Sequence, residues 1–443
     1  MRLEGKSLKG DFLKFIIPSI IAQLVFSLYT MVDGIFVARG VSEVALTAVN
    51  ISMPFSVGMF SVALLFAVGN STIVAILIGQ GEKERANQVF TQNIVILCVL
   101  SVVVTVLVLV FLEPFARFLG ATDNILPYAK DYIGTIAPFA LAYMLSYSFE
   151  TLIKTDGYPK LATIYVTCGA LLNCILDYLM VIVWDWGVKG AAFATGLSQA
   201  IVIVLYLWHF LGPKGTIKFA KFRFHMPTVW RQVKNGMSSG VTELSGGIII
   251  FFFNLAILKY ISEDALVSYT IISYVNTIVV MSMTGIAQGA QPLISYYFGK
   301  GEPQKYKKLF RYGMVSAAIF SVVVTGVCYF GAGGIVSIFL GAGQEELAAY
   351  SVNVFRIFIL SFLLAGYNVV IGGYFASIEK AGFATAVSLI RSLVALVGCM
   401  GILIMCFGGE GLWWAPLMAE GICLLFSVYA VIRFGKIREI DAV

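Results

Sequence analysis

The chain has 443 residues, of which 12% are charged and 59% hydrophobic, and it carries a formal net charge of +6. A soluble chain would be about a quarter charged, so the composition excludes a soluble globular protein and indicates a polytopic α-helical membrane protein. The basic residues stand in short breaks between apolar runs, which argues for membrane topology and against nucleic-acid binding. The seven cysteines lie inside apolar runs without CxxC spacing, so we expect neither disulfides nor a structural metal site. The sequence also lacks the GxxxxGK[ST] motif of ATP-binding loops.

Alternating apolar stretches and polar breaks predict twelve transmembrane helices, because a helix needs about 20 apolar residues to cross the bilayer. We expect them at about 11–37, 44–78, 88–112, 126–153, 160–184, 188–211, 235–258, 264–298, 309–332, 347–376, 381–407 and 411–433. Both termini then lie on one side, which receives 23 of the 30 Lys and Arg residues, against five on the opposite side. This bias predicts cytoplasmic termini in a multi-pass protein of the cell membrane.

The two halves of the chain repeat each other at an offset of about 220 residues. The repeated residues include Ser42-Glu43 with Ser262-Glu263, Gly69, Gly79 and Gly81 with Gly289, Gly299 and Gly301, and Phe118-Leu119-Gly120-Ala121 with Phe339-Leu340-Gly341-Ala342. Small residues recur in any membrane helix, but chance does not explain a constant offset. Because each half holds six spans, we expect two lobes, 1–211 and 235–443, related by a pseudo-two-fold axis along the membrane normal. A cytoplasmic linker at 212–234 would join them. Two lobes that rock around a cleft predict secondary transport by alternating access, not enzyme activity.

Acidic residues inside the first-half spans mark a candidate cation site. A carboxylate at the bilayer centre costs about 2.5–3.5 kcal/mol, so each one requires a function or a partner. Asp33 and Asp177 should lie at similar depth and line one pocket, with Tyr29 and Asn173 each one helical turn away. Such a pair can bind a proton or a cation on one side of the membrane and release it on the other. Alternatively, neighbouring hydroxyls and amides satisfy both acids, which then only hold helices together.

Two further residues of the first half are candidates for function. Glu150 either faces the cavity or pairs with Lys154, which lies one turn later. Pro18 lacks the N–H for a helix hydrogen bond, so the first helix either carries a static kink there or bends during transport.

In the second half, four charged residues within the spans cancel in formal charge: Glu243, Arg356, Arg391 and Glu420. This cancellation favours an internal ion-pair network over a substrate site. The repeat places Gln23 at the position of Glu243 and Phe253 at the position of Asp33. The duplication therefore predicts one scaffold with different chemistry in its two halves.

Several stretches resemble the multidrug and toxic compound extrusion (MATE) transporters. They are Pro18 with residues 29–37 (YTMVDGIFV), residues 285–292 (GIAQGAQP) with 299–301 (GKG), and residues 173–177 (NCILD) followed by 187–192 (GVKGAA) and Thr195. The resemblance covers essentially the whole chain and is to the DinF-like branch, closest to the staphylococcal-type multidrug exporters. It implies a twelve-helix, two-lobe exporter driven by inward flow of protons or sodium ions, with no other cofactor.

The resemblance also implies residue roles. The coupling proton or sodium ion would bind at Asp33, Asn173, Asp177 and Thr195, and the first helix would bend at Pro18. We expect the small organic substrate to bind in a cavity to which Tyr29, Glu150, Glu243, Gln288, Arg356, Arg391 and Glu420 contribute. The NorM-like branch uses carboxylates in helices 7 and 10; Glu243 matches the first, but the tenth predicted helix has no acid. A NorM-type sodium site is therefore not expected.

Three functions remain open at this point. The first is a cation-coupled exporter of amphipathic organic cations, acting as a monomer in the lipid bilayer. The second is a flippase or exporter of a lipid-linked or anionic metabolite, which Arg356 and Arg391 would favour. The third is a channel or membrane scaffold, against which the duplication and the acid pair argue. A net acidic cleft would favour cations, whereas arginines that face inward would favour an anionic group.

Overall fold

The computed structural model describes residues 7–213, 215–340 and 343–440, without the side chains of Ala38, Glu43 and residues 434–440. Some residues that entered the count of basic residues, the repeat or the lobe bounds lie outside this part. They are Arg2, Lys6, Lys214, Gly341, Ala342, residues 441–443 and the side chains of Lys436 and Arg438. Within the described residues, twelve helices are long and apolar enough to cross a membrane, as predicted. The same part of the chain contains no strand, so the all-α fold class is confirmed.

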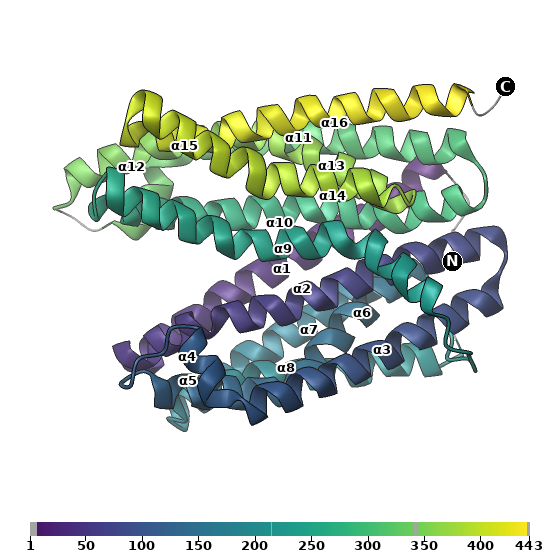
Figure 1. Ribbon diagram of the computed structural model, residues 1–443, viewed down its shortest axis with the longest axis horizontal. Helices are drawn as coiled ribbons and strands as arrows, with labels where there is room; N and C mark the ends of the chain where they lie inside the picture. The colour runs from purple at the N-terminus through teal and green to yellow at the C-terminus, as the bar shows by residue number, and fades with distance from the viewer. Residues whose placement is uncertain (1–6, 214, 341–342, 441–443) are drawn as a thin grey trace.

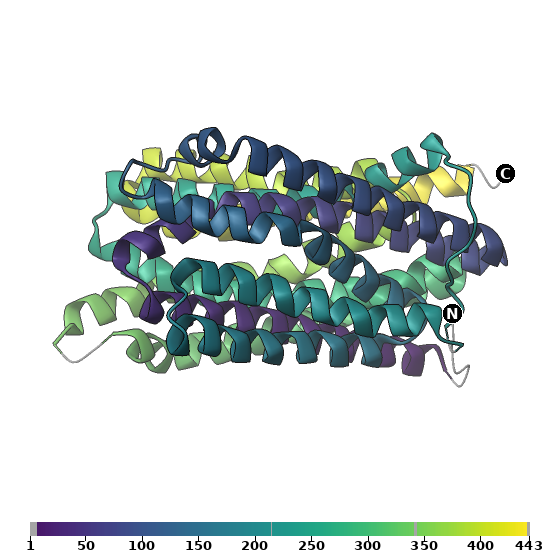
Figure 2. The same ribbon diagram turned by 90° about the horizontal axis from the view of Figure 1, so that it is seen from below.

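The N-terminal lobe consists of α1 (Leu8–Gly40), α2 (Glu43–Gln80), α3 (Lys83–Val110), α4 (Leu112–Phe118), α5 (Leu126–Ile136), η1 (Ala137–Phe139), α6 (Ala140–Thr155), α7 (Pro159–Asp177), the π-helical turn η2 (Tyr178–Val183) and α8 (Gly187–Leu211). The C-terminal lobe consists of α9 (Met226–Tyr260), α10 (Asp264–Gly299), α11 (Pro303–Phe339), α12 (Glu345–Phe358), η3 (Ile359–Ser361), α13 (Phe362–Ser377), α14 (Ala381–Leu389), the π-helical turn η4 (Ile390–Val394), α15 (Ala395–Phe407), η5 (Gly409–Trp414) and α16 (Ala415–Ile440). Figures 1 and 2 show these helices running along one axis, with both chain ends at the same end of the bundle.

Several predicted boundaries differ from the structure. The linker expected at 212–234 ends earlier, because α9 begins at Met226. The buried carboxylate of Asp156 holds the shortened linker against the lobe: it accepts from the Thr216 N–H at 2.9 Å and also contacts His209 Nε2 on α8 at 2.9 Å. The fourth and tenth predicted helices are each interrupted by a short 3₁₀ turn, η1 and η3. The basic residues of this stretch predict a loop, although residues 226–234 are helical.

The repeated residues act as start and stop signals of equivalent helices. Ser42 Oγ accepts a hydrogen bond from Ala45 N at 3.3 Å at the start of α2, and Ser262 Oγ accepts one from Ala265 N at 3.2 Å at the start of α10. Each bond satisfies a backbone donor that the helix leaves free. At the other ends, Gly81 and Gly301 have φ angles of +86° and +71°, which favour glycine. The internal repeat therefore encodes the limits of its longest helices.

The pseudo-two-fold axis passes between α2 and α10. A Cβ atom added to Gly79 would lie 2.2 Å from the carbonyl oxygen of Tyr296, and one added to Gly299 would lie 2.2 Å from that of Ile76. An offset of 220 residues converts one pair into the other. Glycine lets the two backbones approach this closely, so the symmetric contact depends on glycine at both positions.

The lobes pack closely only in the half of the bundle that carries the termini. There, an added Cβ at Gly236 would lie 1.7 Å from the Leu65 carbonyl oxygen, and one at Gly69 would lie 2.0 Å from that of Gln232. Hydrogen bonds cross the same interface, from Gln232 Nε2 to Asn70 Oδ1 (3.0 Å) and from Ser61 Oγ to the Gly240 carbonyl (2.8 Å). In the opposite half of α9, Gly246 and Gly247 have open space around them. The lobes therefore meet at the end with the termini and separate toward the other end (Figure 1).

Candidate functional site

Two acidic residues lie side by side within the N-terminal lobe. Asp33 extends from α1 and Asp177 from the last residue of α7, and their carboxyl groups are close enough to interact directly. Asp177 is fully buried, and among the described residues neither of its carboxyl oxygens, nor Asp33 Oδ1, has a hydrogen-bond partner. Two desolvated carboxylates without donors repel each other unless a proton or a cation lies between them. The structure therefore brings together the two acids that the sequence singled out, and their binding of a coupling cation stays a prediction.

Asn173 and Thr195 complete this group. Asn173 lies one turn before Asp177 and donates from Nδ2 to Thr195 Oγ1 on α8 at 3.4 Å. Its Oδ1 atom is buried and makes no hydrogen bond within the described chain. Carboxylate, amide and hydroxyl oxygens are the ligands that hard cations prefer. The structure thus brings together all four predicted coupling residues, and the π-helical turn η2 follows Asp177 directly, as is frequent at functional sites.

Two tyrosines near the acid pair escaped the sequence analysis. Tyr132 on α5 and Tyr143 on α6 are electrostatic neighbours of Asp33 and Asp177, as is the predicted Tyr29. Helical spacing identified Tyr29 because it shares a helix with Asp33. It could not identify the other two, since they reach the pair from separate helices, and no local pattern distinguishes them from other membrane tyrosines.

A cavity of about 510 Å³ lies between the lobes near the middle of the bundle. Five of the seven predicted cavity residues line it: Glu150, Glu243, Gln288, Arg391 and Glu420. On one side, Gln23 Nε2 donates to Gln288 Oε1 at 2.8 Å, and Gln288 Nε2 donates to the Tyr147 hydroxyl at 2.9 Å. These bonds join α1, α10 and α6, and so connect the two lobes across the cavity. The aromatic residues Phe26, Phe60 and Tyr269 also line it.

Two predicted cavity residues lie elsewhere. Tyr29 does not line the cavity and belongs to the surroundings of the acid pair. Arg356, near the end of α12, donates from Nε to the Tyr329 carbonyl at 3.2 Å, and its guanidinium carbon lies 5.2 Å from the Tyr329 ring centre. Its assignment to the cavity was wrong because residue spacing does not say which face of a membrane helix points inward. Arg356 therefore no longer supports the hypothesis of an anionic substrate.

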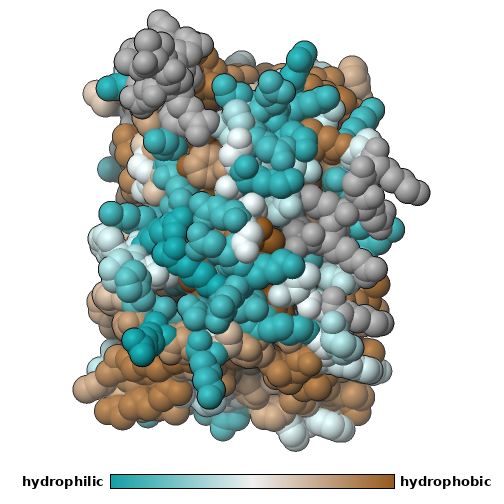
Figure 3. All heavy atoms as spheres, turned by 90° about the vertical axis from the view of Figure 1, so that its right-hand side faces the viewer, coloured by the Kyte–Doolittle hydropathy of each residue, from teal (hydrophilic) through white to brown (hydrophobic). Residues whose placement is uncertain are grey.

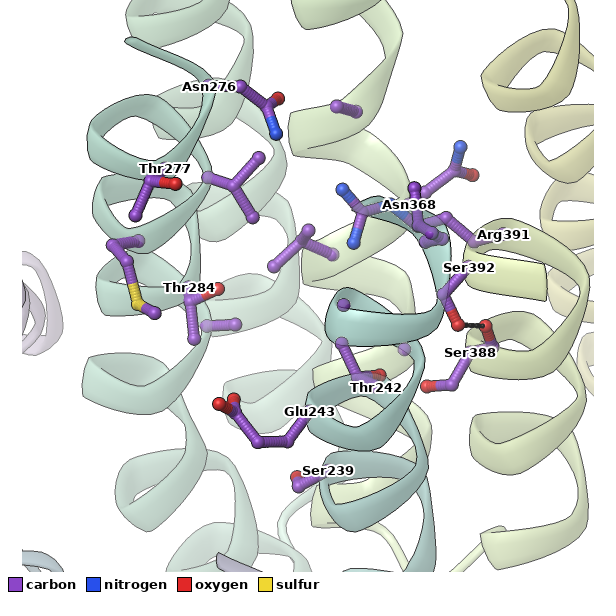
Figure 4. Close-up of a pocket in the computed structure, with 18 of the residues that line it drawn as sticks. Ser239, Thr242, Glu243, Asn276, Thr277, Thr284, Asn368, Ser388, Arg391 and Ser392 are labelled. Carbon is purple, nitrogen blue, oxygen red and sulfur yellow. Dashed lines mark hydrogen bonds between the residues drawn. The ribbon is translucent and has the colours of Figure 1, made fainter. Parts of the chain in front are cut away.

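The charges that line the cavity are unevenly compensated. Glu150 pairs with Lys154 at 2.5 Å, as one of the two alternatives for it required. Glu420 pairs with Arg391, whose Nε lies 2.8 Å from Glu420 Oε1. Glu243 forms neither a hydrogen bond nor an ion pair with a described residue, and its carboxylate points from α9 into the cavity beside Thr284 (Figure 4). The predicted four-residue network is therefore reduced to one pair, and Glu243 is an acid of the cavity lining without a basic partner among the described residues.

Comparison with known proteins places these features in a family context. The family model described as MatE matches residues 18–179 and 241–400, one segment in each lobe. The multidrug export protein MepA of Staphylococcus haemolyticus is 23% identical over 444 residues, covering 99% of this chain and 96% of its own length. Among solved structures, an outward-facing multidrug resistance MATE transporter of the MOP superfamily has a TM-score of 0.93 at 20% identity, covering 99% of this chain and all of its own. A MOP-superfamily transporter from Pyrococcus furiosus has a TM-score of 0.89 at 21% identity, covering 97% and 98%.

Proposed function

Because the chain belongs to the MatE family, we propose that it is a secondary transporter that exports amphipathic organic cations in exchange for protons or sodium ions. The observation that carries this proposal is the pair of neighbouring acids Asp33 and Asp177: both carboxyl oxygens of Asp177 and Oδ1 of Asp33 are buried without hydrogen-bond partners in the described chain. A structural pair would be satisfied by donors, whereas a coupling site must be left free for the ion that it binds. The relatives named as multidrug exporters support the class of substrate.

Helix α1 can couple the cation site to the lobe interface. Asp33 lies in its outer half, while the segment around Pro18 packs on α10 of the other lobe, where an added Cβ at Gly285 would lie 2.8 Å from Ile20 Cα. Thr163 Oγ1 donates to the Pro18 carbonyl at 2.7 Å, so α7 also holds this segment. A proline in a helix allows bending because it removes a backbone hydrogen bond. An ion bound at Asp33 can therefore shift α1 and weaken the closed interface, provided that it binds the two states with different affinity.

The unpaired Glu243 would hold the cationic group of the substrate. Among the described residues that line the cavity, Glu243 is the one charged residue without an oppositely charged partner. Aromatic walls such as Phe60 favour a substrate with an amphipathic body.

All residues of the cation site and the cavity come from one chain, so we propose a monomer as the functional unit.

We also propose that the end with both termini is cytoplasmic. Figure 3 shows hydrophilic side chains gathered over the middle of this end of the bundle, where the basic turns around residues 82–85 and 300–308 lie. The excess of Lys and Arg on this side is the support for the orientation. In a cysteine-free background, an impermeant thiol reagent added outside should label a cysteine at position 122 but not one at 220. The reverse labelling would overturn the orientation.

Transport into proteoliposomes tests the export function. We expect counterflow of an organic cation when a proton gradient or a sodium gradient is imposed, each in a separate experiment with the other ion balanced. The ion whose gradient drives transport is the coupling ion. If transport needs neither gradient, and its rate does not depend on the concentration of either ion, the result would support the channel alternative and contradict the proposal.

A further inference from the structure

The cavity holds a positive group that the proposed function does not use. Arg391 lies in the π-helical turn η4 of the C-terminal lobe and lines the same cavity as Glu243. An arginine stays protonated at any physiological pH, so a charge is always present at this position. Burying it within the membrane is costly unless it is paired.

Glu420 compensates only part of Arg391. Its Oε1 accepts from Arg391 Nε at 2.8 Å, while its Oε2 accepts from Asn368 Nδ2 at 2.7 Å. Both oxygens therefore have fixed donors, and Asn368 is itself held by Ser427 Oγ at 3.1 Å. This arrangement uses one edge of the guanidinium and fixes its orientation. The two terminal amino groups of Arg391 have no partner among the described residues.

The free end of Arg391 points into the cavity. Figure 4 shows the side chain extending from its helix toward the space that Glu243 and Thr284 also border. Its exposed side-chain fraction of 13% is consistent with a group buried in the lobe whose end reaches the cavity. A guanidinium offers paired donors that match the two oxygens of a carboxylate or a phosphate. A free acid on α9 and a free guanidinium edge on η4 thus form two subsites of opposite charge in one cavity.

We propose that Arg391 is an anion-recognising subsite, and that the preferred substrates are amphoteric: an amphipathic body with a cationic group for Glu243 and a carboxylate or phosphate for Arg391. This inference rests on the proposed export function and narrows its substrate class. A substrate with only a positive charge would leave the amino groups of Arg391 without acceptors and would meet its repulsion. The role of Glu420 and Asn368 is to position Arg391.

A matched pair of probes tests the subsite: an amphipathic amine that carries a carboxylate, and its methyl ester. The ester keeps the cation and the body but removes the negative charge. We compare Kd values of both probes for the wild type and for Arg391→Met/Glu420→Gln, in which both charges of the pair are removed so that neither acid nor base is left unpaired. The affinity for the acid relative to the ester should fall at least tenfold in this double variant. Arg356→Met is the control, because that guanidinium lies outside the cavity, and it should keep the wild-type ratio.

An unchanged acid-to-ester affinity ratio in the double variant would overturn the subsite. This includes an equal loss of affinity for both probes, which would indicate a structural role of the pair. Should the double variant not fold in detergent, Arg391→Lys keeps the charge beside Glu420 but loses the paired donors, and the ratio should again fall. Failure of the proposed export function has a different signature, since the wild type would then bind the probes but move neither of them in response to an ion gradient.

Discussion

The two lobes share one scaffold but treat equivalent positions in opposite ways. In the N-terminal lobe, Asp33 and Asp177 lie together, and Asp33 Oδ1 and both carboxyl oxygens of Asp177 have no donor among the described residues. In the C-terminal lobe, the repeat equivalent of Asp33 is Phe253, whose ring stacks on Tyr269 at a centroid distance of 4.8 Å. At an offset of 221 residues, Gly398 takes the place of Asp177. One lobe keeps unsatisfied carboxyl oxygens where the other has an aromatic ring in its core and a glycine with open space around it.

The same contrast separates the acids that remain in the C-terminal lobe. Glu420 is paired with Arg391 and bonded to Asn368, so it stabilises the lobe. Under the proposed function, an intramembrane acid acts in transport when the fold leaves its oxygens free, and acts in stability when donors surround it. The mere presence of a carboxylate in a span does not distinguish the two roles.

The largest effect is expected for the acid pair. Asp33→Asn and Asp177→Asn should each abolish gradient-driven efflux, because the amide keeps the shape but can no longer exchange a proton or neutralise a cation. Efflux from proteoliposomes measures this. Gly398→Ala, at the position equivalent to Asp177 in the other lobe, is the matched control and should keep the coupling, because open space surrounds this residue and it does not line the cavity. Wild-type efflux from either Asn variant would contradict the assignment of that residue.

The glycines on the pseudo-two-fold axis should behave alike in both lobes. Gly79→Val and Gly299→Val each place side-chain atoms where an added Cβ already lies 2.2 Å from a carbonyl oxygen. Closure at the end with the termini should then fail, and transport should fall about tenfold or more. Gly333→Val on α11 is the control, because open space surrounds this residue and it does not line the cavity. Clearly unequal effects of the two axis variants would show that the symmetry of the contact has no functional meaning.

Thermal stability should distinguish Glu420 from Asp177, because neutralising the first acid should destabilise the protein and neutralising the second should not. Glu420→Gln leaves Arg391 without its charge partner and should cost about 2 kcal/mol, less than a fully buried pair because both side chains reach the cavity. Adding Arg391→Met should recover much of this loss. Asp177→Asn should not lower stability, since its carboxyl oxygens have no partners to lose in the described chain. Melting curves in detergent measure all three variants.

The same melting curves, recorded with substrate, test whether Glu420 contacts the ligand directly. We expect Glu420→Gln to melt lower than the wild type but to keep most of the stabilisation by substrate. A variant that melts like the wild type and loses this stabilisation would mean that Glu420 binds the exported cation itself.

The smallest effect is expected for Arg356. Its guanidinium packs on the Tyr329 ring away from the cavity, and such cation–π contacts contribute about 0.5–1 kcal/mol at exposed sites. Arg356→Met should therefore lower stability by no more than this and leave transport unchanged. A transport defect comparable with that of Arg391→Met/Glu420→Gln would return Arg356 to the substrate path.

The sequence by itself determined what depends on neighbours along one helix. Hydrophobic length predicted the twelve spans, and the constant offset predicted the two lobes. Helical spacing offered Lys154 as a partner for Glu150, one of two alternatives, and the structure confirms this pair. It also placed Asn173 beside Asp177, because residues three or four apart share one face of a helix. The limits of the repeated helices were also local, since capping serines and left-handed glycines act within one turn.

Only the tertiary structure decided which faces of the helices meet. In a bilayer, both the lipid-facing and the core-facing sides of a helix are apolar, so composition does not reveal how the helix is rotated about its axis. For this reason Tyr132 and Tyr143 joined the acid pair unforeseen, Arg356 turned toward Tyr329, and Glu243 was left alone in the cavity. Whether a buried charge has a partner depends on contacts between helices far apart in the chain, and those contacts form only when the two lobes are packed.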